Sequence, residues 1–384
     1  MKVLMIVGQY YPIAGGTERE CQKLATRLQK RGVGVTVLTQ HCAGLPDYEV
    51  IDGIPVYRRM KGWHWYEYSY MLSVLWFLLR NMRAYDVVQC FGLYLFIPPV
   101  VLVTYLLGKK AVGRVEGAGA YGDFHRIRQL RFGGLILESA RRLDRVISIA
   151  RHVGCEIEKE GFPGRAIAAI PNSVDQELYR PENTRVQTDR KRICFVGRLA
   201  EEKGIDCLIK AVKQVSAAEP GVELFIVGDG PMRDALENLS DSLHVQELIH
   251  FIGNSTALSY YRGSDMFVLP SLSEGLSLSL LEAMSCGLPV IASNVAGNSE
   301  VIDPHGAASA IPPGSYGVAE YGIMVNPGDV QGFTRAIIRL VNDDELSHQL
   351  QSSARRHVEK NYALDKIADD YHSLYLSLGV RQRQ

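Results

Sequence analysis

Short apolar runs alternate with amphipathic stretches through the first half of the chain. The continuous runs Val3–Val7 and Val33–Thr39 predict strands that are buried on both faces of a sheet. A helix is expected near Thr17–Arg31, and helices are expected between most later strands. Further strand candidates are Val56–Arg59, Asp86–Cys90, Lys110–Val115 and Arg145–Ser148. This alternation predicts a parallel sheet with helices on both faces.

A polar, charged segment at Tyr179–Arg192 interrupts this pattern and is the predicted domain boundary. After it, strands are expected at Ile193–Val196, Glu223–Val227, Ile249–Phe251, Met266–Leu269, Pro289–Ala292 and Gly322–Val325, and helices at Asp206–Ala217 and Leu278–Cys286. We therefore predict an α/β protein with two doubly wound, Rossmann-like domains, residues 1–180 and 190–363. Such domains bind ligands beyond their strand ends, and two that face each other bury a ligand between them.

The last periodic stretch, Leu364–Leu378, is helical, and in a two-domain chain the segment 364–384 can cross back to pack on the first domain. Periodicity does not decide this point. The apolar stretches Met71–Leu79 and Leu93–Leu107 are shorter than the roughly 18–20 residues that span a bilayer, and buried helices are expected there.

Composition narrows the function class without identifying it. A length of 384 residues suits two domains, and the 42 basic residues balance the 42 acidic ones, so no global charge favours a nucleic-acid partner. None of the seven cysteines has the spacing of a metal site or a redox pair, which predicts free thiols within the core. With no signal-peptide pattern at the N-terminus, a cytoplasmic protein is expected.

The segment Pro270–Met284 carries the most chemistry. A predicted strand ends at Pro270, and a helix is expected to begin near Gly275 or Leu276. The backbone N–H groups of Gly275, Leu276 and Ser277 are then available to an anion at the helix start, where the helix dipole assists.

Glu274 and Glu282 bracket this predicted anion site. Eight residues of helix span about 12 Å, so the two carboxylates are too far apart to share one atom. They are suited to hold opposite ends of an extended ligand, such as a sugar and a ribose on either side of a diphosphate. As an isolated pair they would be read as a solvated loop residue and an exposed helix residue.

The Glu-x7-Glu pattern on a strand–loop–helix resembles the retaining glycosyltransferases of the GT-B fold, family four, also called group 1. The resemblance implies that Glu274 contacts the donor sugar and Glu282 the nucleotide ribose. The segment Val196–Gly204 resembles the family's GR-x-EKG loop. It implies that Arg198 and Lys203, after Gly197, meet the diphosphate, one as a planar fork and one as a point charge.

Weaker matches follow in the order that the family has. Val227–Pro231, with Gly228, resembles the turn that shapes the donor crevice, and Phe251–Gly253, with Ile252, resembles the loop that reads the nucleobase. Val295–Glu300 is similar to the family's GGxxE turn. In the first domain, Gly15 and Gly16 resemble a glycine loop near the donor phosphate.

The chain departs from the family after Lys110–Val115, where relatives often have a histidine. Glu116, Asp123 and His125 are the candidates for the polar group beside the anomeric carbon, and they stay open alternatives. His125 and Arg126 also begin a basic stretch that reaches Phe132. This stretch is either a solvated helix face or a site for an anionic membrane or an acceptor phosphate, and Trp63–Tyr66 are candidates for the same surface.

Taken together, the resemblance implies a retaining, metal-independent hexosyl- or glycosyltransferase, with no cofactor beyond its nucleotide-sugar donor. A UDP-sugar is expected ahead of a GDP-sugar, and the expected acceptor is a saccharide or a lipid-linked sugar, as in cell-surface polysaccharide or glycolipid synthesis. The expected place is the cytoplasm or the inner membrane face. Alternatives are an epimerase on the same fold and a non-catalytic nucleotide-sugar binding protein. Residues 304–320 look like an inserted surface loop.

Overall fold

The computed structural model describes residues 1–12, 15–63, 66–182, 190–308 and 310–379, and these divide into two compact units. The first unit is Met1–Asn172 with Leu364–Gln384, and the second is Ser173–Ala363. The chain thus passes between the units at Asn172–Ser173 and again at Ala363–Leu364. Most of the polar segment that was predicted as the boundary, residues 183–189, lies outside the described residues.

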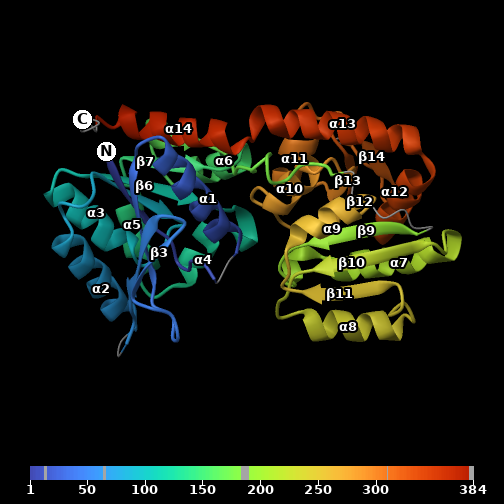
Figure 1. Ribbon diagram of the computed structural model, residues 1–384, viewed down its shortest axis with the longest axis horizontal. Helices are drawn as coiled ribbons and strands as arrows, with labels where there is room; N and C mark the ends of the chain where they lie inside the picture. The colour runs from blue at the N-terminus through green and yellow to red at the C-terminus, as the bar shows by residue number, and fades with distance from the viewer. Residues whose placement is uncertain (13–14, 64–65, 183–189, 309, 380–384) are drawn as a thin grey trace. The chain divides into compact units, whose positions relative to one another are not determined.

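The first unit contains a sheet of eight strands within the described residues, in the order β3-β4-β2-β1-β5-β6-β7-β8. Figure 1 labels β3, β6 and β7 of this sheet. All neighbours pair in parallel except β3 and β4. The strands are β1 (Lys2–Ile6), β2 (Gly34–Gln40), β3 (Tyr48–Ile51), β4 (Ile54–Met60), β5 (Val87–Phe91), β6 (Lys110–Val115), β7 (Arg145–Ser148) and β8 (Ile167–Ala169). Its α-helices are α1 (Gly16–Lys30), α2 (Tyr66–Arg80), α3 (Ile97–Leu106), α4 (Asp123–Gln129), α5 (Gly133–Ala140), α6 (Arg151–Lys159) and α14 (Leu364–Ser377).

The second unit has a sheet of seven strands within the described residues, in the order β11-β10-β9-β12-β13-β15-β14, with only β14 antiparallel to its neighbour. The strands are β9 (Lys191–Val196), β10 (Val222–Val227), β11 (Ile249–Gly253), β12 (Met266–Leu269), β13 (Val290–Ser293), β14 (Tyr316–Val318) and β15 (Ile323–Val325). Its α-helices are α7 (Ile205–Ala218), α8 (Arg233–Ser242), α9 (Ala257–Gly263), α10 (Leu278–Ser285), α11 (Ala296–Ile302), α12 (Val330–Asn342) and α13 (Asp344–Asn361).

The predicted fold class, α/β with two doubly wound parallel sheets, is confirmed. The three strands that the sequence did not reveal, β3, β8 and β14, are each three or four residues long and lie at sheet edges. Edge strands bury only part of their surface, so they lack the continuous apolar runs that mark central strands. Because β14 falls within residues 304–320, the prediction of a plain surface loop there was wrong for Tyr316–Val318.

Helix α14 completes the core of the first unit. Its apolar face, with Tyr371 and Tyr375, joins side chains of β1, α1 and β2 in one buried cluster. The Tyr375 hydroxyl donates to Gln89 Oε1 at 3.2 Å. At the rim, Arg31 Nε lies 2.5 Å from Asp369 Oδ1. Helix α14 is therefore part of the hydrophobic core that the N-terminal strands and α1 form.

The prediction of buried helices at Met71–Leu79 and Leu93–Leu107 was only half right. Both stretches form helices, α2 and α3, but each buries one face and exposes the other. Leu72 and Trp76 of α2 and Tyr105 of α3 are more than half exposed. Among the described residues, no helix is both long enough and apolar enough to cross a bilayer.

All seven cysteines are free thiols. Cys21, Cys90, Cys194, Cys207 and Cys286 are buried, as predicted. Cys42 is only partly buried and Cys155, on the outer side of α6, is exposed, so the prediction of core positions was wrong for these two.

We expect Tyr375→Ala to lower the free energy of unfolding of the first unit by about 3–5 kcal/mol, because the lost ring leaves a cavity in the core. The matched control is Leu376→Ala, one residue along the same helix, where the leucine is 43% exposed. It should change stability by less than about 0.5 kcal/mol. Urea unfolding of both variants measures the difference, and equal effects would contradict a core role for α14.

Candidate functional site

The carboxyl ends of β9 and β12 carry two loops that lie in direct contact within the second unit. The Leu272 backbone N–H donates to the Glu202 carbonyl oxygen at 2.8 Å. Gly204, at φ +59°, allows this approach, because a Cβ there would lie 2.4 Å from the Pro270 carbonyl oxygen. Only glycine combines this left-handed backbone with the lack of a side chain. The loop after β9 is therefore held against the loop after β12.

A third segment closes on the same place from α11. A Cβ on Gly297 would lie 2.6 Å from the Glu274 carbonyl oxygen and 2.3 Å from that of Gly275. The first turn of α11 thus packs directly on the backbone of the Glu274 loop. The Val295–Glu300 motif therefore fixes the position of the loop that carries Glu274, the predicted sugar-binding residue.

These loops join Lys203 to Glu274. Lys203 Nζ donates to Glu274 Oε1 at 2.6 Å, and the Ser271 hydroxyl donates to the same oxygen at 2.7 Å. Only 8% of the Glu274 side chain is exposed. An ion pair this enclosed is strengthened by the low local dielectric. The second oxygen, Oε2, makes no hydrogen bond with the described residues and is available for a ligand.

Arg198 lies on the same loop as Lys203 but is exposed. Its guanidinium makes no hydrogen bond or ion pair with any described residue. An unpaired guanidinium beside a paired ammonium is suited to an incoming anion, since binding costs Arg198 no existing partner.

The start of α10 agrees with the helix predicted for Leu278–Cys286, but not with the start that was expected near Gly275 or Leu276. The helix begins at Leu278, and Ser277 is its N-cap residue, whose hydroxyl accepts from the Leu280 N–H at 3.3 Å. Gly275 and Leu276 lie in the loop before the helix, so the expected helix start near these residues was wrong. The serine hydroxyl competes with the backbone for the first N–H groups, and this delays the helix.

Glu282 lies inside α10 and is 2% exposed. The Tyr261 hydroxyl, from α9, donates to Glu282 Oε2 at 3.0 Å, and Tyr261 is itself fully buried. Burial and the neighbouring Glu282 raise the pKa of Tyr261 well above its usual value, so the phenol stays protonated as a donor. Tyr261 therefore fixes the orientation of the Glu282 carboxylate.

The other predicted donor-side positions line the ends of β9, β10 and β11. The Gly197 N–H donates to the Val227 carbonyl oxygen at 3.0 Å, and the Gly228 N–H to the Gly253 carbonyl oxygen at 2.9 Å. Ile252 lies in β11 and is partly exposed. These positions lie at the carboxyl ends of three neighbouring parallel strands, as the strand pattern predicted.

In the first unit, Gly15 is the N-cap residue of α1 and Gly16 is its first residue. The Gly15 N–H donates to Glu18 Oε2 at 3.0 Å, and a Cβ on Gly15 would lie 2.6 Å from that oxygen. The Glu18 carboxyl thus closes over the glycine backbone. Burial raises its pKa above the ordinary value.

Asp123 holds the loop that follows β6. Its Oδ2 accepts from the backbone N–H groups of Glu116 and Gly117, at 2.7 and 3.0 Å. The two bonds lower the pKa of Asp123 against a larger upward effect of burial. This oxygen is committed to the loop, so Asp123 shapes the surroundings of Glu116.

Glu116 pairs with a buried arginine. Its Oε1 lies 3.5 Å from Arg114 Nε, and that oxygen is fully enclosed, although a fifth of the side chain stays exposed. Arg114 also donates to Asn172 Oδ1. Burial raises the pKa of Glu116 to about 7, even though Arg114 opposes the rise. A carboxyl that titrates near neutral pH is able to give or take a proton.

His125 and Arg126 lie on the exposed side of α4. His125 Nε2 lies 2.9 Å from Gln129 Nε2, and Arg128 pairs with Glu160, the residue that follows α6. Phe124 and Ile127 fill the buried side of the same helix. The basic side chains of α4 therefore form an exposed helix face.

Sequence reasoning missed Ser271 and Tyr261. Ser271 had a local signal, since it lies three residues before Glu274 on the same loop. Tyr261 had none, because it lies 21 residues from Glu282 and only the packing of α9 against the sheet brings the two together. Among the described residues, no group of three or more His, Cys, Asp or Glu side chains is placed to hold a metal ion.

Two family sequence models match adjacent parts of the chain. The model described as "Glycosyl transferases group 1" matches residues 176–357, and that of "Glycosyltransferase Family 4" matches residues 14–178. The two matches follow the two structural units closely and together reach from residue 14 to residue 357.

Individual proteins are similar over the whole chain. An uncharacterized glycosyltransferase of Methanocaldococcus jannaschii is 26% identical, over 98% of each chain. The glycogen synthase of Mycobacterium tuberculosis is 25% identical, over 100% of this chain and 96% of its own. Among solved structures, HepE of Anabaena in complex with UDP-glucose superposes with a TM-score of 0.80 at 17% identity, over 98% of this chain and 100% of HepE.

The raised pKa of Glu116 leads us to expect that the free energy of unfolding depends on pH. Its pKa is about 7 in the folded protein against an ordinary value of 4.5, so folding favours the protonated form. The stabilising contribution is complete below the ordinary value and is lost as the pH rises through about 7. Between about pH 5 and pH 8 the free energy of unfolding of the wild type should fall by on the order of 2 kcal/mol relative to that of Glu116→Gln. This figure allows for the partial exposure of the Glu116 side chain.

Urea unfolding of both proteins across this pH range measures the difference. Glu158→Gln, on the exposed side of α6 in the same unit, is the matched control and should follow the wild type. A Glu116→Gln variant that also follows the wild type at every pH would contradict the raised pKa.

Proposed function

Because the chain belongs to the group 1 glycosyltransferases of the GT-B fold, we propose that it is a retaining, metal-independent transferase for nucleoside-diphosphate sugars. The observation that carries this proposal is the cluster at the ends of β9 and β12. It combines an enclosed carboxylate, Glu274, with a paired cation, Lys203, and an unpaired one, Arg198. The Glu274 carboxylate can accept hydrogen bonds from sugar hydroxyls, and Lys203 and Arg198 can donate to a diphosphate.

The donor enters this cluster as a competitor for Lys203. A diphosphate carries more charge than Glu274, so it draws Lys203 and Arg198 toward its oxygens. Glu274 Oε1 then exchanges the lysine for a sugar hydroxyl, while Ser271 keeps the carboxylate in place. Binding of the diphosphate thereby prepares the sugar site. Glu282, oriented by Tyr261, takes the ribose hydroxyls.

The reaction that fits these groups is a front-face displacement. The bond between the anomeric carbon and the leaving phosphate oxygen breaks, and the acceptor oxygen bonds to the same face of that carbon. The acceptor proton passes to the leaving phosphate oxygen. Arg198 and Lys203 stabilise the charge that develops on the leaving group, a task that needs no metal ion. In the first unit, Glu116, whose pKa is about 7, stays a candidate for contact with the acceptor.

We propose a UDP-sugar as donor ahead of a GDP-sugar, and the support is the UDP-glucose complex of HepE. The glycogen synthase relative supports a saccharide as acceptor, and a lipid-linked sugar is the alternative acceptor. The pathway we propose is cell-surface polysaccharide or glycolipid synthesis. Seven free thiols support a reducing compartment, so we place the reaction in the cytoplasm, at the inner membrane face for a lipid-linked acceptor.

An epimerase on the same fold and a non-catalytic binding protein are the competing functions. An epimerase interconverts the donor without any acceptor, and a binding protein leaves it unchanged. Incubation of a panel of UDP- and GDP-sugars with saccharide acceptors, in the presence of EDTA, separates the three outcomes. Transfer with an unchanged anomeric configuration, read by NMR, is the result we expect.

Glu274→Ala should lower kcat/KM for sugar transfer by about a hundredfold or more, because two charge-assisted hydrogen bonds to the sugar are lost. The matched control is Glu201→Ala, an exposed glutamate on the loop that carries Lys203. It should keep the activity of the wild type. Undiminished transfer by Glu274→Ala would remove the basis of the proposed donor site.

Tyr261→Phe should raise KM for the donor roughly tenfold and lower kcat much less, because it frees the Glu282 carboxylate to turn away from the ribose. Tyr260→Phe, the neighbouring tyrosine on α9, is the control and should change neither constant. If both variants behave alike, Tyr261 is not a positioning residue for the donor.

A further inference from the structure

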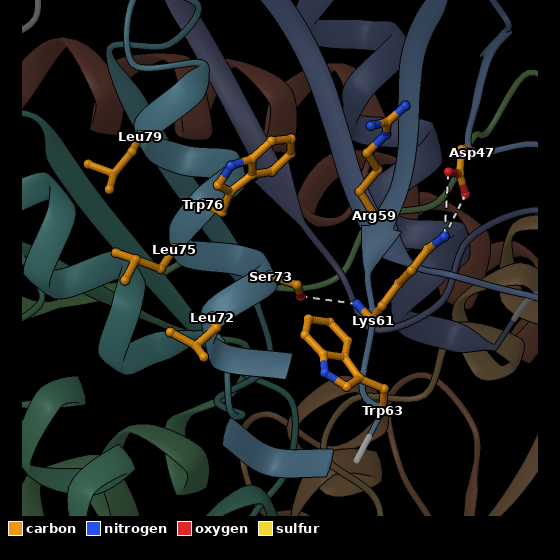
Figure 2. A pocket seen from close by; sticks show the side chains of 9 residues that line it. All are labelled: Asp47, Arg59, Lys61, Trp63, Leu72, Ser73, Leu75, Trp76 and Leu79. Atoms are coloured by element: carbon orange, nitrogen blue, oxygen red, sulfur yellow. Dashed lines mark hydrogen bonds and ion pairs between the residues drawn. The ribbon is translucent and has the colours of Figure 1, made fainter. Parts of the chain in front are cut away.

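A hollow of about 580 Å³ lies between the end of β4 and helix α2 in the first unit. We call it the α2 groove. Figure 2 shows that one wall carries cationic side chains from β4 and the segment after it, and the other carries leucines and a tryptophan from α2. The residues used below are Arg59, Lys61, Trp63, Leu72, Trp76 and Leu79.

The apolar wall is the outward face of α2. Leu72, Trp76 and Leu79 follow one another at helical spacing, and their exposed fractions are 57%, 53% and 46%. Trp63, 59% exposed, stands at the end of the groove. Single exposed apolar residues are ordinary on protein surfaces, but four that share one hollow form a patch that favours a partner.

The apolar surface continues beyond the groove. Helix α3 packs beside α2, and its Leu102, Tyr105 and Leu106 are 50%, 84% and 67% exposed. No charged residue occurs between Ile97 and Leu106. Exposed apolar side chains therefore occur on both neighbouring helices.

The opposite wall has a net positive charge. Lys61 Nζ lies 3.2 Å from Asp47 Oδ1, whereas Arg59 has no hydrogen-bond or ion-pair partner among the described residues. Arg80 adds a further cation, with its guanidinium 5.2 Å from the centre of the Trp76 ring. Two cations and one carboxylate thus line the groove, and a third cation lies over its Trp76 ring. An isologous pair of this chain would bring two such positive patches together, so a second copy fits poorly.

We propose that the α2 groove binds an anionic phospholipid at a bilayer surface. The phosphate lies at Arg59 and Lys61, and one acyl chain follows Leu72, Trp76 and Leu79. In the α2 groove the cations lie on one wall and the apolar side chains on the other. A membrane interface is arranged in the same way, with charged headgroups outside and hydrocarbon within. Tryptophans with one apolar and one polar side prefer that boundary.

Helix α2 has 15 residues and spans about 22 Å, so it lies on the bilayer and does not cross it. The proposal specifies the surface for the membrane contact proposed above, but it does not depend on sugar transfer. Its failure would leave transfer to a soluble saccharide untouched.

The test is flotation of the full chain with phosphatidylcholine vesicles, with and without phosphatidylglycerol, in the absence of donor. The only tryptophans of the chain are Trp63, Trp65 and Trp76, so intrinsic fluorescence reports directly on this region. We expect binding that requires phosphatidylglycerol and weakens with salt, together with a blue shift of the emission.

Leu72→Ser combined with Trp76→Ser should weaken the binding by roughly tenfold or more, since the burial of both side chains is lost. The matched control is Leu376→Ser, an exposed leucine on α14 of the same unit, which should bind as the wild type does. Arg59→Ser should weaken binding about fivefold, and Lys213→Ser, an exposed lysine of α7, should not. Glu274→Ala should bind vesicles normally. Circular dichroism checks that each variant is folded.

Several results would overturn the proposal. One is equal binding to neutral and anionic vesicles, and another is wild-type binding by the double variant. Binding without a blue shift would assign the contact to another surface, such as the basic side of α4. Sedimentation that shows a dimer, lost in the double variant, with no vesicle binding would assign the groove to a second copy of the chain.

Discussion

The candidate site depends on backbone segments that lie closer together than side chains would allow. At the carboxyl end of β12, the loop with Glu274 touches the loop after β9 through Gly204 and the start of α11 through Gly297. Any larger residue at either glycine would push a loop away by the size of its Cβ. Because these contacts are between backbones, they fix the two loops in a position where Lys203 Nζ lies 2.6 Å from Glu274 Oε1. The chemistry of the site rests on this spacing.

The Lys203–Glu274 ion pair is the central charge interaction of the site. Without a donor, Lys203 neutralises Glu274 in an enclosed position, where an unpaired carboxylate would be costly. Under the proposed function, a diphosphate replaces Glu274 as the partner of Lys203, and sugar hydroxyls replace Lys203 as partners of Glu274. In the same proposal, Arg198, which has no partner among the described residues, supplies the initial attraction for the diphosphate. The buried Arg114–Glu116 pair of the first unit is different, because burial there brings the carboxyl to a pKa of about 7.

Burial also decides what the apolar helices do. In α2, one face fills the core with Tyr70, Val74 and Leu78, and the opposite face leaves leucines and a tryptophan in the α2 groove. The same composition would serve a helix buried on all sides, and the sequence pattern favoured that interpretation. Only the position of α2 at the outside of the sheet, beside α3, shows which half of its surface has no protein partner.

The sequence alone determined the central strands, most helix positions and the order of the site motifs, because each is written in a local pattern. A buried strand needs a continuous apolar run, and the Glu274, Arg198 and Lys203 motifs follow directly after such runs. Tertiary structure decided what depends on neighbours in space. It placed the edge strand β3, left Gly275 and Leu276 in the loop before α10, gave Glu282 its partner Tyr261, and bound Asp123 to the backbone at Glu116. Those partners lie many residues apart or depend on which group takes a hydrogen bond, and periodicity carries no information on either.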